Sequence, residues 1–172
     1  MVSSPYLLGW LFAKIWRVKT LILLSGIPGS GKSTWARAYL KDHQNTHIVS
    51  SDGIRLRLFG AFQAFHDEKL VWKTFLEDIN SHVQDEGDVT VIADSTNLTN
   101  AYRRHYFEKT SGFDRHIIVI FDAEFPLCEM RNKMRSRDKV VSDEAMKRLE
   151  AEWESPSKEV LALYDEVIRI SD

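Results

Sequence analysis

Cysteine is almost absent from this sequence, since Cys128 is its single example in 172 residues. One cysteine cannot form an internal disulfide and cannot supply a cysteine-rich zinc cage. Its isolation is typical of a protein kept in a reducing compartment, and we expect a cytoplasmic location. A chain of this length buries roughly 70% of the surface that its unfolded form exposes, so its core requires neither a disulfide nor a structural metal.

An excess of positive charge is also lacking. The 23 lysines and arginines are balanced by 25 acidic residues, and the formal net charge is −2. This balance excludes a protein that coats nucleic acid through its overall charge, so any polyanion must meet a local basic patch. A solvated helix face is the alternative interpretation of such a run. One candidate run has Asp138 as its single acid among the cations Arg131, Lys133, Arg135, Arg137 and Lys139.

Hydrophobic runs long enough to cross a membrane are missing as well. The apolar stretch from Tyr6 to Val18 is shorter than the about 20 residues that a spanning helix needs, and Lys14 and Arg17 interrupt it. It also lacks the basic start and the small-residue cleavage site of a secretory signal. We expect residues 1–19 to be an apolar N-terminal extension, either a docked helix or a non-native tail, with no stable membrane association. One domain would follow over residues 20–172.

Short apolar runs alternate with segments of helical periodicity from residue 20 onward. Such an alternation predicts a parallel sheet with helices on both faces. We therefore expect an α/β three-layer sandwich with a central sheet of about five strands and a helical lid. Ligands of this architecture bind beyond the C-terminal ends of the strands. The expected strands are 21–24, 47–49, 89–93, 117–121 and 167–170, and the expected helices are 32–41, 67–86, 100–110, 126–135 and 143–153.

The first expected strand leads directly into a glycine-rich segment that fits the pattern G-x-x-x-x-G-K-[ST] and precedes a helix. Glycines there let backbone N–H groups turn around phosphate oxygens, and the helix N-terminus adds the positive end of its dipole. Lys32 would reach the transferred phosphate, and Ser33 would hold Mg²⁺. The pattern predicts that ATP is bound by Gly26, Pro28, Gly29, Ser30, Gly31, Lys32, Ser33 and Thr34.

A carboxylate and a guanidinium follow the second expected strand, one helical turn apart, at Asp52 and Arg55. We expect this strand to neighbour the first one, which would bring both groups to the position of an acceptor hydroxyl. Asp52 would accept the hydroxyl proton as the oxygen attacks the γ-phosphate. Arg55 would hold a phosphate or carboxylate of the acceptor through its planar fork. The alternative is a helix-capping aspartate beside an ordinary surface arginine.

Short polar side chains follow the third expected strand. Asp94 would hold Mg²⁺ through water, and Thr96 and Asn97 would bind the acceptor, although a polar turn that caps the next helix is an equal alternative. Arg103 and Arg104 on that helix would meet the backbone phosphates of a polymer.

The basic run follows the fourth expected strand and begins within the helix expected from Pro126. Arg131 and Arg135 are four residues apart and therefore share one helix face. Arginines on a mobile lid can neutralise the charge that develops during phosphoryl transfer as the site closes. Lys133 and Lys139 fit solvated charges.

These segments together resemble the polynucleotide 5′-hydroxyl kinase family of P-loop phosphotransferases, over residues 20–172. The resemblance implies that Asp52 is the general base and that Arg55 contacts the acceptor phosphate. It also implies that Arg131 and Arg135 are lid residues over ATP. It rests on GIPGSGKSTWAR at 26–37, Ser51-Asp52-x-x-Arg55, Asp94-Ser95-Thr96-Asn97-Leu98 and Arg131-Asn132-x-x-Arg135.

Two departures separate this chain from some phage members of that family. Ser51 stands directly before the base where they have arginine, which is nearer the bacterial type. Their Asp-Thr-Asn element is stretched here to Asp94-Ser95-Thr96-Asn97.

The sequence thus predicts an ATP- and Mg²⁺-dependent kinase, with the 5′-OH end of DNA or RNA as the acceptor that the resemblance implies. A small-metabolite or nucleotide-sugar kinase of the same superfamily is the first alternative. A regulatory switch that binds ATP without catalysis is the second, and Asp52 argues against it because a switch needs no acceptor base.

Overall fold

The computed structural model describes residues 17–171. The predicted N-terminal extension falls on residues 1–16 for nearly all of its length and so lies outside the described residues. The first strand starts at Lys19. Across the described part of the chain, no helix has the length and apolar character needed to cross a membrane.

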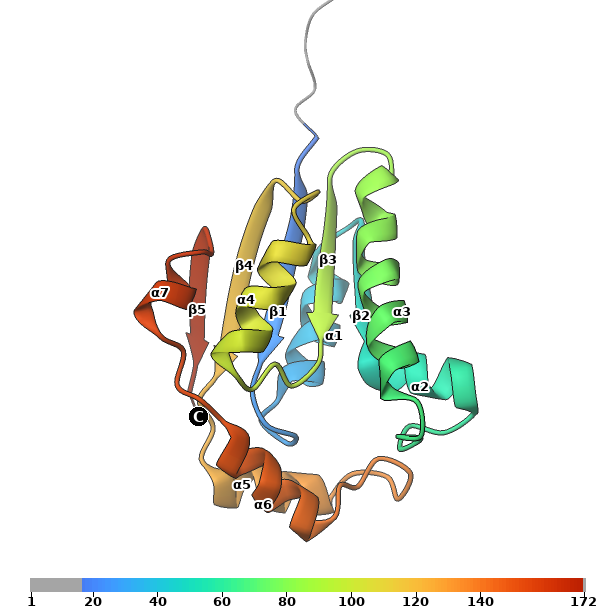
Figure 1. The fold of residues 1–172 in the computed structure, drawn as a ribbon, viewed down its shortest axis with the longest axis vertical. Helices are drawn as coiled ribbons and strands as arrows, with labels where there is room; N and C mark the ends of the chain where they lie inside the picture. Colours follow the sequence, from blue (N-terminus) through green and yellow to red (C-terminus); the bar gives the residue numbers. More distant parts are fainter. Residues whose placement is uncertain (1–16, 172) are drawn as a thin grey trace, which may run out of the picture.

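Five strands form one parallel sheet within residues 17–171, as the sequence predicts (Figure 1). The central strands are continuous aliphatic runs because helices cover both faces of the sheet. Their order across the sheet is β2-β3-β1-β4-β5. The strands are β1 (Lys19–Ser25), β2 (Thr46–Ser50), β3 (Val89–Asp94), β4 (Arg115–Phe121) and β5 (Glu166–Ile170).

The strand order corrects one prediction. β2 does not neighbour β1, because β3 pairs with β1 on one side and with β2 on the other. In this register Ala93 is the partner of both Leu23 and Val49, and Ser50 lies beside Asp94. Asp94 therefore lies at the end of β3, next to the strand β1 that leads into the P-loop, and β2 lies at the edge of the sheet.

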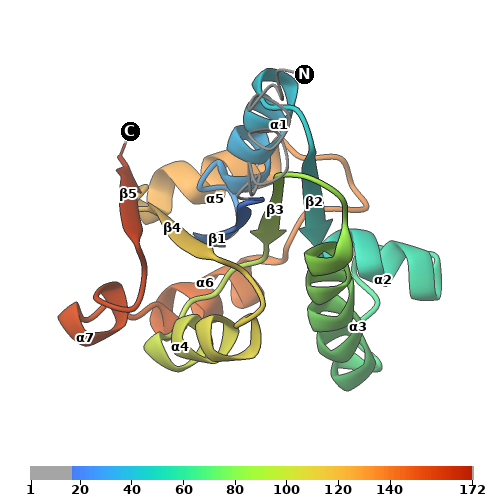
Figure 2. The ribbon, with the colours of Figure 1, turned by 90° about the horizontal axis from the view of Figure 1, so that it is seen from above.

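Two groups of helices cover the two faces of the sheet (Figure 2). On one face, Trp35, Ala36 and Tyr39 of α1 (Lys32–Asp42) pack on the sheet residues Ile22 and Ile92. The opposite face is covered by α3 (Glu68–Ser81), α4 (Asn100–Lys109) and the short α7 (Lys158–Leu161). This arrangement confirms the three-layer sandwich.

Two short helices escaped the sequence analysis. One is α7, and the other is α2 (Ser51–Phe59), which starts directly after β2. The Ser50 side chain caps α2 by accepting a hydrogen bond from the Gly53 N–H at 3.0 Å. Gly60 ends the helix with a φ of 76°, which glycine adopts at little cost. The predicted helix over 67–86 is shorter than expected, since α3 stops at Ser81 and a 3₁₀ turn, η1 (His82–Gln84), follows.

The predicted helical lid consists of α5 (Phe125–Lys133) and α6 (Asp143–Glu152), below the strand ends in Figure 1. The two helices share an apolar cluster in which Cys128 and Met146 contact Ile27. Asn132 closes the loop between them. Its amide donates to the Val141 carbonyl at 2.7 Å, and its oxygen accepts from the Val141 N–H at 3.1 Å.

Candidate nucleotide and phosphoryl-transfer site

The P-loop packs tightly against the lid helix α5. Gly29 has a φ of +85°, and a Cβ placed on it would lie 2.3 Å from the Cys128 carbonyl oxygen. Only glycine fits a position that combines left-handed backbone geometry with this approach. The P-loop is also hydrogen-bonded to the turn after β3, since the Gly26 N–H donates to the Thr96 carbonyl at 2.9 Å.

Lys32 is folded back into the P-loop. Its ammonium group donates to the carbonyls of Gly26 and Ile27, at 2.7 and 2.8 Å, and lies 3.3 Å from Ser30 Oγ. Burial lowers the pKa of Lys32 from 10.5 to about 8, and the negative charge of Asp94 opposes this shift. The lysine is thus held among oxygen atoms that a phosphate group would replace.

Asp94 and Ser33 lie together at the end of β3. Asp94 is buried, and desolvation raises the pKa of its carboxyl, although the Lys32 charge and a hydrogen bond with Ser33 act in the opposite direction. A carboxylate and a hydroxyl at the mouth of a P-loop are the oxygen donors that Mg²⁺ prefers. The donor set therefore fits the predicted magnesium site.

Asp52 and Arg135 lie close to each other beyond the C-terminal ends of the strands. Arg135 Nη2 lies 3.7 Å from Asp52 Oδ2, and both side chains retain access to solvent. Both also act electrostatically on Lys32, which indicates that the three charges share one site. Arg131 lies half-buried in the last turn of α5.

Arg55 does not have the free fork that the sequence analysis expects. Its Nε and Nη2 donate to the two carboxylate oxygens of Glu68, at 2.9 and 2.7 Å, and its Nη1 lies 3.2 Å from Asp52 Oδ1. The guanidinium also lies 4.9 Å from the ring centre of Phe65 and 5.5 Å from that of Trp72. Only 6% of the side chain is exposed, so Arg55 supports Asp52 instead of offering an open phosphate-binding group.

The prediction that Arg103 meets a polymer's phosphates is wrong. Arg103 is fully buried, and its guanidinium donates to Ser25 Oγ at 3.0 Å, Asn100 Oδ1 at 3.1 Å and the Leu98 carbonyl at 2.7 Å. The side chain fastens α4 to the end of β1 and cannot reach a surface phosphate. Arg104, its neighbour, is exposed.

Asn97 also has a structural place that disagrees with acceptor binding. The side chain is buried, with its amide donating to the Leu24 carbonyl at 2.7 Å and its oxygen accepting from Ser95 Oγ at 2.9 Å. Its φ of 44° lies in the left-handed region, which asparagine tolerates better than most residues. Thr96 is half-buried at the same turn. The alternative interpretation of a structural polar turn therefore applies to Asn97.

Three residues that support this site were not singled out from the sequence. Glu68 fixes Arg55, Phe65 covers the Arg55 guanidinium with a ring that is 60% exposed, and Asn132 holds the lid loop. A signal existed for Asn132 alone, because it lies within the lid motif between Arg131 and Arg135.

A family model described as an AAA domain, AAA_33, matches residues 21–156 of the chain. The chain belongs to this AAA domain family. The matched residues contain the P-loop, Asp52, Asp94 and Arg135, whereas the start of β1, α7 and β5 lie outside them.

The chain is also similar to curated proteins and to solved structures. The chain is 27% identical over 139 residues to the L-seryl-tRNA(Sec) kinase of Methanococcus maripaludis, covering 79% of this chain and 53% of the relative. It is 29% identical over 109 residues to a 2′,3′-cyclic-nucleotide 3′-phosphodiesterase of Pongo abelii, covering 63% and 25%. The chain thus spans between a quarter and about half of the length of these relatives.

Two solved structures show the same P-loop kinase-like fold. Kti12 of Chaetomium thermophilum, in complex with ADP-AlF3, matches with a TM-score of 0.64 and 18% identity over 88% of each chain. A chain of the Pnkp1/Rnl/Hen1 RNA repair complex matches with a TM-score of 0.65 and 20% identity, over 79% of this chain and 44% of the other.

Proposed function

We propose that this AAA-domain protein is an ATP-dependent kinase that phosphorylates the 5′-OH end of DNA or RNA. The observation that carries the proposal is the contact between Asp52 and Arg135 beside Lys32. It joins a half-exposed carboxylate, an arginine and the P-loop lysine at one end of the sheet. A site that only sensed ATP would need no solvent-accessible carboxylate at this place.

Each of these three side chains has a role in phosphoryl transfer. The acceptor oxygen forms a bond to the γ-phosphorus, the bond from that phosphorus to the bridging β–γ oxygen breaks, and ADP leaves. Asp52 takes the proton of the attacking hydroxyl. Arg135 and Lys32 neutralise charge on the transferred group and the leaving phosphates.

Magnesium is part of the proposal, with Ser33 and Asp94 as the groups that would hold it. When bound, the ion would neutralise charge on the β- and γ-phosphates of ATP. Burial of Asp94 beside Lys32 and Ser33 supports a role for this carboxylate on the phosphate side of the site.

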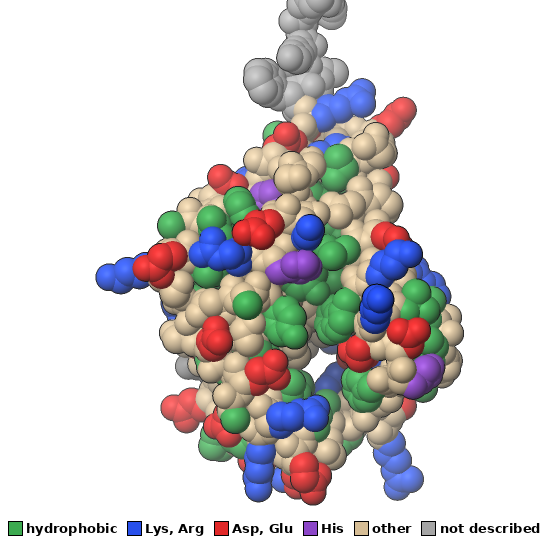
Figure 3. Space-filling model, viewed as in Figure 1, with side chains coloured by type: hydrophobic (Ala, Val, Ile, Leu, Met, Phe, Trp, Pro, Cys, Tyr) green, Lys and Arg blue, Asp and Glu red, His purple; other side chains and the backbone are tan. Residues whose placement is uncertain are grey.

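The acceptor side of the site offers an aromatic surface and few open cations. Phe65 is 60% exposed and stacks on Arg55, which in turn contacts Asp52. In space, only Arg55 separates this exposed ring from the proposed base Asp52. The ring therefore suits a nucleobase next to the attacking hydroxyl, because stacking of a base on an aromatic side chain contributes about 1–3 kcal/mol to binding. The molecule is hollowed near the lid in Figure 3, and the surface hollow between α2 and the lid loop is lined by Phe62, Gln63 and Arg137, among others. One relative, the L-seryl-tRNA(Sec) kinase, is named for a substrate that contains RNA, which supports a nucleic acid substrate.

A small-metabolite or nucleotide-sugar kinase is the second candidate. The structure favours it at one point, because Arg103 is buried and the Arg55 fork is occupied by Glu68. Of the three arginines predicted to hold the acceptor, only Arg104 is open to solvent. If the acceptor is a nucleic acid, the remaining cations would contact only a few nucleotides. We propose the reducing cytoplasm as the location of the protein.

The decisive experiment is transfer of labelled γ-phosphate to a series of 5′-OH DNA and RNA oligomers from one to about ten nucleotides, at several salt concentrations. We expect labelling to improve from mononucleotide to short oligomer and the apparent affinity to fall with salt, since each phosphate contact releases counterions. Phe65→Ala should raise KM for oligomers more than KM for ATP. Asp52→Asn is the inactive control.

The outcomes separate the candidates. Labelling of a sugar, nucleoside or other metabolite with no oligomer labelled would move the assignment to the second candidate. Tight ATP binding with no transfer to any acceptor would instead support a regulatory switch.

A further inference from the structure

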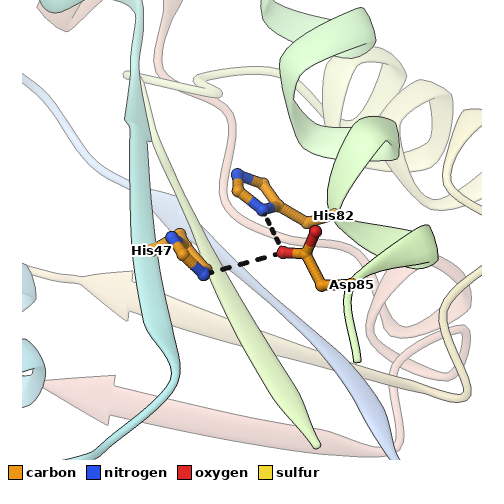
Figure 4. A group of neighbouring side chains, drawn as sticks. All are labelled: His47, His82 and Asp85. Carbon is orange, nitrogen blue, oxygen red and sulfur yellow. Dashed lines mark hydrogen bonds and ion pairs between the residues drawn. The ribbon is translucent and has the colours of Figure 1, made fainter. Parts of the chain in front are cut away.

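A cluster of two histidines and one aspartate lies away from the P-loop, on the outer edge of the sheet (Figure 4). His47 belongs to β2, His82 begins the 3₁₀ turn after α3, and Asp85 follows that turn. Their potential ligand atoms all lie within 4.8 Å of one another. None of these residues has a part in the proposed phosphoryl transfer.

The two imidazole rings are aimed at one point. They stack with their centres 4.1 Å apart and their planes 19° apart. His82 Nδ1 lies 2.6 Å from Asp85 Oδ2, and His47 Nε2 lies 3.7 Å from that same oxygen (Figure 4). Two nitrogen atoms thus converge on one carboxylate oxygen.

The backbone around the cluster is fixed by hydrogen bonds. The Lys19 ammonium donates to the carbonyls of Asp85 and Gly87, and the Asp85 N–H donates to the His82 carbonyl at 3.2 Å. His47 is held in register by the pairing of β2 with β3, where it lies beside Val91. The three side chains therefore come from rigid elements, which is what a preorganised ligand set requires.

We propose that His47, His82 and Asp85 bind a divalent transition-metal ion, with zinc as the ion that fits best. Two imidazoles and a carboxylate are typical zinc ligands, with water in the fourth position. In a tetrahedral zinc site with metal–ligand distances of about 2.0–2.1 Å, neighbouring ligand atoms lie about 3.3 Å apart. The observed separations of 2.6 and 3.7 Å fall on either side of this value. Small rotations of these side chains would bring the ligand atoms to that spacing.

The cluster is also accessible to an ion from solvent. Exposed fractions of the side chains are 44% for His47, 38% for Asp85 and 22% for His82. Both histidines line a surface hollow of about 420 Å³ beside β2, which leaves room for the water ligand. A bound ion would join the edge strand β2 to the turn before β3, so we expect it to stabilise the sheet edge without acting in phosphoryl transfer.

Calorimetric titration of the untagged full chain with ZnCl₂, in the absence of ATP and Mg²⁺, tests the proposal. We expect one zinc ion per chain at this cluster and an increase in Tm with zinc. Affinity should fall at least tenfold in His47→Ala and in Asp85→Asn. His43→Ala is the matched control, because His43 is an exposed histidine stacked on Tyr39 and should leave zinc affinity unchanged.

A second metal readout separates this site from the P-loop. Asp94→Asn removes a carboxylate of the proposed magnesium site and should leave zinc binding at the cluster intact. Co²⁺ bound to the wild type should give the visible absorption of a tetrahedral site, and Asp85→Asn should remove it. Equal zinc affinity in the wild type and both cluster variants, or loss of zinc binding in Asp94→Asn alone, would overturn the proposal.

Discussion

Arg135 Nη2 lies 3.7 Å from Asp52 Oδ2, which joins the loop after the lid helix α5 to the first turn of α2. The helix ends at Lys133, so Arg135 does not share a helix face with Arg131 as the sequence predicts. The contact brings together two residues from opposite ends of the predicted site. Arg55 lies on the other side of Asp52, with Nη1 at 3.2 Å from Oδ1. Each carboxylate oxygen of Asp52 thus faces one guanidinium, and this arrangement orients the carboxylate while its surface stays accessible to an acceptor.

Replacement of the proposed base tests the reaction directly. We expect Asp52→Asn to lower kcat by roughly 10²–10⁴-fold, because the amide cannot accept the hydroxyl proton. ATP affinity should be nearly unchanged, since the phosphates are held by the P-loop. Equilibrium ATP titration beside steady-state kinetics measures both quantities. A collapse in ATP affinity would mean that Asp52 serves the nucleotide or the metal, and the base would have to be sought elsewhere.

Replacement of the lid arginine tests its positioned charge. We expect Arg135→Ala to lower kcat more than it raises KM for ATP, and Arg135→Lys to restore little, because a point charge lacks the planar two-pronged donor geometry. Arg131→Ala should have the same direction of effect. Lys133→Ala is a control, since Lys133 is an exposed lid cation 3.9 Å from Asp143. Full rescue by lysine, or an equal loss in the control, would indicate a general electrostatic effect.

The protonation of Lys32 should couple ATP binding to pH. Lys32 loses its proton near pH 8 in the free protein, whereas the negative phosphates of bound ATP favour the charged form and raise its pKa. Affinity is therefore fully present below pH 8 and should fall by up to tenfold per unit as pH rises above it. Calorimetric titrations at pH 7, 8 and 9 measure this change, and Lys32→Ala should bind ATP weakly with no such slope. A pH-independent affinity in the wild type would contradict it.

The close approach of the P-loop to α5 should make Gly29 intolerant of any side chain. Gly29→Ala combines a φ of +85° with a Cβ that would lie 2.3 Å from the Cys128 carbonyl, so we expect a loss of more than about 2 kcal/mol in the free energy of unfolding. Gly60→Ala is the matched control. Its φ is +76° but nothing lies within 4 Å of the added Cβ, so it should cost only about 1 kcal/mol. Urea denaturation compares them, and equal losses would contradict the steric argument.

The neighbouring arginines of α4 should behave differently. Arg103→Ala removes the donor to the buried Ser25 hydroxyl and one of the two donors to the Leu98 carbonyl, which also accepts from the Glu154 N–H, so we expect it to destabilise the protein by about 2–4 kcal/mol. Arg104→Ala should change stability by less than about 0.5 kcal/mol, since its side chain is exposed. If the acceptor is a polynucleotide, Arg104→Ala should also reduce the salt dependence of oligomer affinity. Thermal unfolding of both variants and oligomer kinetics of the second provide the measurements.

Local patterns in the sequence determined most of the fold. Within residues 17–171, the aliphatic runs predicted all five strands, and the 3.6-residue periodicity predicted the α-helices except α2 and α7. The P-loop was equally readable, because its chemistry requires glycines, Lys32 and Ser33 at fixed spacing within one continuous segment. Both kinds of signal depend on residues that are neighbours along the chain.

Tertiary structure decided what distant segments do to one another. The strand order is one example, since no local pattern in the sequence predicts that β3 lies between β1 and β2. The roles of arginines were another, because the same side chain serves a phosphate or a buried carbonyl according to what surrounds it. Glu68 occupies the fork of Arg55, the end of β1 encloses Arg103, and the lid carries Arg135 to Asp52. Burial and hydrogen-bond partners are set by packing between segments, and no local spacing in the sequence encodes them.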